Sequence, residues 1–121
     1  MAKIFTPKAK EAFAPLTAQS ASFTGYEVEW ASYYGLVANL AVAKQSSLGG
    51  TFKLQYSLDG ILWADVPALT NSAVTTIAIA ANGTYTLWYP LMFPAHMFRV
   101  AVVVSAGNAD FSSQFMATKI A

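Results

Sequence analysis

The chain has 121 residues, one histidine, no cysteine and a formal net charge of +1. This length predicts one domain with its own hydrophobic core, the lack of cysteine excludes disulfides and thiolate metal sites, and the small net charge gives no reason to expect nucleic-acid binding. Charged residues make up only 11% of the chain, against about 25% in ordinary soluble domains, so we expect other subunits to cover much of its surface.

The N-terminal segment differs from the rest of the sequence. Residues 1–16 are predicted to form an arm, followed by a β-sandwich domain over residues 17–121. The stretch from Thr6 to Ala14 combines a helix-start pair with good helix formers, and Pro15 would end a short helix there. A frayed tail is the alternative. The apolar residues of the arm favour docking on a neighbouring subunit: Ile4, Phe5 and Phe13.

From about Thr17 onward, apolar and polar residues alternate with period two, which is the pattern of β-strands. Such runs begin near Tyr26, Phe52, Ile77 and Phe98. We expect six residues in the core of the sandwich: Phe52, Leu54, Tyr56, Trp63, Val100 and Val102. The run from Phe98 to Val104 is apolar on both faces except at Arg99, so its second face needs a cover from another subunit or from elsewhere in the chain.

Turn signals separate these runs: Gly49-Gly50, Asp59-Gly60, Asn82-Gly83 and Gly107-Asn108. An Asp-Gly pair between two alternating runs is a strong signal for a β-hairpin. Turns at this spacing predict an all-β fold, an antiparallel β-sandwich of the jelly-roll or immunoglobulin-like kind.

The sequence contains no recognisable group of catalytic, cofactor-binding or metal-binding residues. The single histidine, His96, has no nucleophile and orienting acid that would make it catalytic, so we expect a structural role for it. Glu27 and Glu29 share one strand face, where solvation is more natural than the bracketing of a sugar bond. We therefore expect that the protein is not an enzyme and uses no cofactor.

No membrane span is expected either. The longest apolar runs, such as Val100 to Val104, fall far below the roughly 20 residues of a transmembrane helix. The N-terminus also lacks the pattern of a signal peptide.

Two adjacent aromatic pairs provide further candidate contacts. In a strand, one member of each pair must point away from the core. The residues are Tyr33 and Tyr34, and Trp88 and Tyr89. Outward aromatic rings suit a subunit interface, but they could also stack on sugars, so a carbohydrate-binding β-sandwich module is the alternative function.

One segment, from Gly50 to Pro67, resembles a stretch of small β-sandwich proteins found in bacteriophage genomes. Their pattern G-T-x-K-L-Q-x-S-x-D-G-x-x-W-x-D-x-P is matched at every fixed position, from Gly50-Thr51 through Asp59-Gly60 and Trp63. Their later strands are matched in order by Leu87-Trp88 and by Phe98-Arg99-Val100-Ala101-Val102, so that the likeness covers about Tyr26 to Lys119.

Two observations limit what the resemblance implies. A Ser-x-Asp-Gly-x-x-Trp hairpin also occurs in discoidin-like sugar-binding sandwiches, so the hairpin does not fix the function. The bulky apolar stretch from Leu91 to Phe98 departs from the phage pattern. The resemblance implies a structural protein of the virion, in the capsid, its decoration, a spike or the tail. Such a protein would have copies of itself and other virion proteins as partners.

Overall fold

The computed structural model describes residues 5–29, 33–66, 76–89 and 97–120, and the side chains of 10–28, 37–66, 76–87 and 97–116. Within these residues the fold is all-β, with eight strands joined in one antiparallel sheet. The strands are β1 (Phe5–Gln19), β2 (Phe23–Thr24), β3 (Val28–Glu29), β4 (Tyr33–Ser57), β5 (Ala64–Asp65), β6 (Thr76–Ile79), β7 (Gly83–Tyr89) and β8 (Met97–Ile120). The predicted all-β, antiparallel fold is confirmed.

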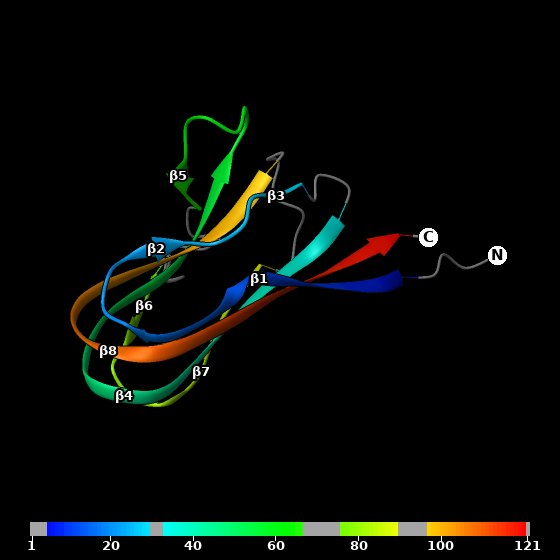
Figure 1. Cartoon of the computed structure of the whole chain (residues 1–121). Coiled ribbons are helices and arrows are strands. Elements are labelled where there is room, and N and C mark those ends of the chain that lie inside the picture. The colour runs from blue at the N-terminus through cyan, green and yellow to red at the C-terminus, as the bar shows by residue number, and fades with distance from the viewer. Residues whose placement is uncertain (1–4, 30–32, 67–75, 90–96, 121) are drawn as a thin grey trace.

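Two long strands, β4 and β8, form the centre of the sheet. They pair with each other from Tyr33 opposite Lys119 to Ser57 opposite Met97, with register shifts between Ala43 and Gly50. Figure 1 shows both strands turning back on themselves at the left of the view. The long ribbon therefore folds over, and each half of it belongs to a different layer of a sandwich-type fold.

Different short strands pair with β4 and β8 in the two layers. In the first layer, β1 pairs with residues 109–120 of β8, and β7 pairs with residues 36–42 of β4. In the second layer, β2 and β3 pair with residues 97–102 of β8, whereas β5 and β6 pair with residues 50–56 of β4. The order is thus β1-β8-β4-β7 in one layer, with β8 and β4 again central in the other.

Inward-facing side chains of both layers fill one core. Phe52, Leu54, Val100 and Val102 are buried there, as predicted. Tyr56 is half-buried against the core. Aromatic rings connect the layers: the Phe23 ring, from β2, lies 4.9 Å from that of Phe13 and 5.5 Å from that of Phe111.

The prediction of Trp63 in the core is wrong. Trp63 lies beyond the turn, where its ring packs under the Arg99 guanidinium at 4.2 Å, on the outer side of the second layer. On the outer face of Phe98–Val104, Ala101 is buried by residues of the same chain. Val103 stays exposed.

The short N-terminal helix is also wrong, because β1 begins at Phe5 and continues to Gln19. The expected boundary at residue 16 lies inside this strand. A helix of six residues is marginal on its own, whereas the strand gains a full partner in β8 and buries Ala12 and Phe13 in the core. Tertiary pairing therefore overrides local helix propensity.

Two of the four predicted turns do not separate strands, so these two predictions are wrong. Gly49-Gly50 lies at a register shift within β4, and Gly107-Asn108 lies at the bend within β8. Neither pair ends a strand. Asp59-Gly60 does form the loop of the β4–β5 hairpin, and Asn82-Gly83 does separate β6 from β7.

Candidate interaction surface

The most exposed apolar side chains of the described residues gather in the loop between β4 and β5. Leu58 is 70% exposed, Ile61 79% and Leu62 76%. We call these three residues the apolar tip. The loop that carries them projects beside β5 at the top of Figure 1. Single exposed leucines are ordinary on protein surfaces, but three in five residues form a patch of the kind used in contacts.

Hydrogen bonds of the Asp59 side chain hold the tip in shape. Its Oδ1 accepts bonds from the backbone N–H of Ile61 at 2.8 Å and of Leu62 at 3.0 Å. The buried Ser57 hydroxyl donates to the same oxygen at 3.1 Å and accepts from the Gly60 N–H at 2.8 Å. Gly60 itself has a φ of +78°, which favours glycine. The loop is therefore fixed by its own polar groups, while its apolar side chains remain free.

The same bonds set the charge of the loop. The backbone N–H groups of Leu62 and Ile61, in that order, lower the pKa of Asp59 below its ordinary value. The carboxylate that organises the tip thus stays ionised to a lower pH than an ordinary aspartate.

An apolar cavity lies beside the tip. It has a volume of about 240 Å³ and is lined by Tyr56, Leu58, Asp59, Leu62, Trp63 and Ala64. Ile61, the most exposed residue of the tip, does not line it. The loop thus presents both a projecting aliphatic side chain and a neighbouring hollow.

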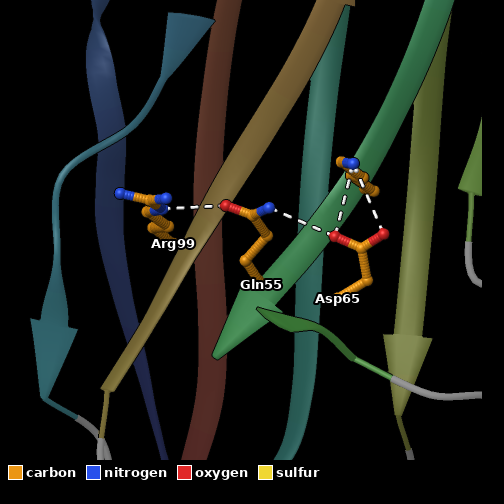
Figure 2. Close-up of polar contacts among 4 residues, drawn as sticks. Gln55, Asp65 and Arg99 are labelled. Atoms are coloured by element: carbon orange, nitrogen blue, oxygen red, sulfur yellow. Dashed lines mark hydrogen bonds and ion pairs between the residues drawn. The ribbon is translucent and has the colours of Figure 1, made fainter. Parts of the chain in front are cut away.

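A row of polar side chains crosses the outer face of the second layer next to this loop. Arg99 Nε donates to Gln55 Oε1 at 2.9 Å, and Gln55 Nε2 donates to Asp65 Oδ1 at 3.1 Å. Figure 2 shows these three side chains in line across β8, β4 and β5. Lys53 Nζ completes the row with an ion pair to Asp65 at 3.3 Å.

This row explains the motif that carried the phage resemblance. Gln55 lies opposite both Arg99 and Asp65 in the strand register, so the three side chains share one rung of the sheet. The Ser57-x-Asp59-Gly60 part of the motif builds the loop, and Trp63 supports Arg99. These roles are structural. Lys53 and Gln55 alternate with Phe52 and Leu54 and therefore lie on the opposite face of the strand, but the bonds between strands depend on a register that the sequence does not reveal.

The predicted contact residues fall elsewhere. Backbone pairing brings several of them to one end of the first layer: Phe5 opposite Ile120, Tyr33 and Tyr34 opposite Lys119 and Thr118, and Trp88 and Tyr89 opposite Val37 and Leu36. Their side chains, together with Ile4 and His96, lie outside the described residues. Phe13 is only 5% exposed and belongs to the core of its own chain, so it is not available as an anchor for a neighbour.

Other kinds of site have little support in the described part of the chain. Within it, no group of three histidine, cysteine, aspartate or glutamate side chains could hold a metal ion. Across the same residues, no helix is long and apolar enough to cross a membrane. Tyr26, which is 47% exposed, is the one aromatic side chain described as exposed.

The sequence matches no protein-family model and no curated protein. Among solved structures, the fold is similar to that of the SPBc2 prophage-derived protein YomS, with a TM-score of 0.64 and 9% identity over 98% of each chain. It is also similar to a chain from Bacillus endospore appendages, described as disulfide-linked pili, with a TM-score of 0.50 and 15% identity over 98% of this chain and 92% of that one. At such identities the likeness establishes the fold alone.

Proposed function

We propose that this chain is a non-catalytic structural subunit of a bacteriophage particle, repeated in the capsid, its decoration or the tail. The observation that carries the proposal is the apolar tip, because Leu58, Ile61 and Leu62 are exposed in a loop that is already held in shape. A preorganised apolar patch loses little conformational freedom when a partner covers it. Such a patch on a chain with 11% charged residues would be a liability for an isolated monomer.

The similar structures support this proposal in their general character. One is derived from a prophage, and the other belongs to a pilus. The pili are described as disulfide-linked, whereas this chain has no cysteine. Disulfides therefore cannot link copies of this protein, and burial of apolar area would be the driving force of assembly.

The carbohydrate-binding alternative lacks a specific observation in its favour. A sugar platform needs exposed aromatic faces, but the Arg99 guanidinium lies over the ring of Trp63, and Tyr26 is the one exposed aromatic among the described side chains. In the polar row beside Trp63, Arg99 and Gln55 already donate hydrogen bonds within the row itself.

Native mass over a range of protein concentrations tests the proposal. We expect oligomers whose population grows with concentration, and incorporation of the protein into particles when it is supplied during their assembly. A protein that stays monomeric at millimolar concentration and is left out of particles would overturn the proposal. Glycan binding by that monomer would favour the carbohydrate-binding module.

A further inference from the structure

The two edges of the first layer are built differently. One edge is β1, whose sequence carries three charged residues, Lys8, Lys10 and Glu11, and two prolines, Pro7 and Pro15. Its pairing with β8 is also broken by three register shifts. Charges, prolines and bulges are the devices by which proteins prevent unwanted strand addition at a sheet edge. The β1 edge is therefore protected.

The opposite edge is β7, which has none of these devices. Its sequence, G-T-Y-T-L-W-Y from Gly83 to Tyr89, contains no charged residue and no proline. It pairs with β4 in unbroken register, from Leu36 opposite Tyr89 to Val42 opposite Gly83. Among the described residues, no strand pairs with its other side. Alternate residues of such a strand direct their N–H and C=O groups outward, where they can bond to an added strand.

The side chains of β7 are compatible with such an addition. Tyr85 and Leu87 face the core, whereas Thr84 and Thr86 are exposed on the outer face. The Tyr85 hydroxyl donates to the carbonyl of Ala81 at 2.8 Å, which fixes the start of the strand. An added strand would thus meet a regularly paired edge with small hydroxyl-bearing side chains, and cross-strand threonine pairs are favourable.

We propose that β7 pairs antiparallel with β7 of a second copy of this chain, about a two-fold axis, so that the two first layers become one continuous sheet. A second copy suits this edge because a two-fold axis places the strand opposite itself, and an uncharged strand opposes itself without repulsion. The same operation on β1 would bring Lys8 and Lys10 close to their own copies. The inference rests on the proposed subunit role and names one of its contacts, on a different layer from the apolar tip.

Cysteine cross-linking tests the pairing directly, because the chain has no cysteine of its own, so the disulfide of a single-cysteine variant must join two copies and that of a double variant is scored only as covalent dimer. Residues directly opposite in an antiparallel pair have Cβ atoms about 4.5–5.5 Å apart, close to the distance that a disulfide needs. Which variant forms covalent dimers depends on the residue of β7 through which the two-fold axis passes. We expect them from Thr84→Cys if the axis passes Thr84, from Thr86→Cys if it passes Thr86, and from the double variant if it passes Tyr85. Thr17→Cys, an exposed threonine on the protected β1 edge, is the matched control and should stay monomeric under oxidation.

A charge on the edge supplies the second arm. Thr86→Lys should weaken dimerisation at least about tenfold in sedimentation equilibrium, because it places like charges beside each other in the new pair. Thr17→Lys should leave the dimer unchanged. The inference is overturned if none of the β7 cysteine variants cross-links, or if Thr86→Lys dimerises like the wild type. Association that survives Thr86→Lys but is lost in variants of the apolar tip would refute the β7 pair and leave the proposed function standing. A β7 dimer that never enters particles would refute the proposed function and leave the β7 pair standing.

Discussion

Substitution of Gly107 tests the fold-over of the β4–β8 ribbon, on which both layers depend. Gly107 has a φ of +69°, and a Cβ atom added to it would lie 2.2 Å from the carbonyl oxygen of Ser46 and 2.3 Å from that of Ser47. Alanine therefore meets two separate penalties. The left-handed backbone costs about 1–2 kcal/mol, and the clash, which pushes the two strands apart, adds about 1–3 kcal/mol. We expect Gly107→Ala to lower the free energy of unfolding by about 2–5 kcal/mol.

Two other glycines separate these penalties. Gly83 has a φ of +150° but no atom within 4 Å of an added Cβ, so Gly83→Ala should lose about 1–3 kcal/mol from backbone strain alone. Gly49 would place its Cβ at an ordinary 3.6 Å from Ser105 Oγ, without a left-handed φ. Gly49→Ala should therefore stay within about 1 kcal/mol of the wild type, on the stabilising side.

Guanidinium unfolding at concentrations where each protein is monomeric gives the three differences. The account requires that Gly107→Ala is the least stable of the three variants and Gly49→Ala the most stable. If Gly107→Ala unfolds at the same midpoint as Gly83→Ala, the close approach of β8 to Ser46 and Ser47 is refuted.

Three further predictions concern the core, the loop and the N-terminal strand. Leu54→Ala should cost about 2–5 kcal/mol in chemical unfolding, because Leu54 is buried in the second layer, and a loss near zero would place it on the wrong face. Asp59→Ala should speed hydrogen exchange at the Ile61 and Leu62 amides. Because folding lowers the pKa of Asp59 from 3.8, the wild-type protein should protect these two amides fully above pH 3.8. The protection should be lost as the pH falls through the lowered pKa. Protection that does not change with pH in this range would contradict the hydrogen bonds from the two amides to Asp59. Deletion of residues 1–11 should lower the thermal unfolding midpoint as well as weaken assembly, because Phe5–Glu11 pairs with Gln114–Ile120. An unchanged midpoint would show that these residues form a separate arm, as the sequence predicted.

Period-two alternation was sufficient to predict four core residues of the second layer. It placed Phe52, Leu54, Val100 and Val102 inside, and all four are buried. The Asp59-Gly60 hairpin followed from turn chemistry, which acts over a few residues. Features of this kind are local, so a single sequence contains the information that determines them.

The errors arose where distant segments decide the structure. Gly107-Asn108 has the composition of a turn, but β8 continues through it because β4 pairs along both sides of the bend. The segment from Ala9 to Ala14 has helix propensity, but its pairing with residues of β8 that lie 100 or more positions away makes it a strand. Trp63 has a large apolar ring of the kind found in cores, but this ring lies against Arg99 of β8, which is distant in sequence.

The candidate surface was predicted only in general terms. Low charge content led us to expect that partners cover some of the surface, but the aromatic pairs were chosen because large rings dominate interfaces. The apolar tip was passed over because Leu58, Ile61 and Leu62 lie in a turn without periodicity. A signal was present: Asp59 two residues after Ser57 favours a capped loop, and such a loop leaves the aliphatic side chains around it without a place in the core.

The most direct test of the central claim is the association constant of the protein with and without the exposed side chain of Ile61. Ile61 is 79% exposed in the single chain, and covering it in a contact should contribute about 1.5–2.5 kcal/mol. Sedimentation equilibrium should therefore show that Ile61→Ser associates roughly 10- to 60-fold more weakly than the wild type, whereas the matched Ile61→Val variant stays close to it. Equal association by the Ile61→Ser variant and the wild type would contradict assembly through the apolar tip.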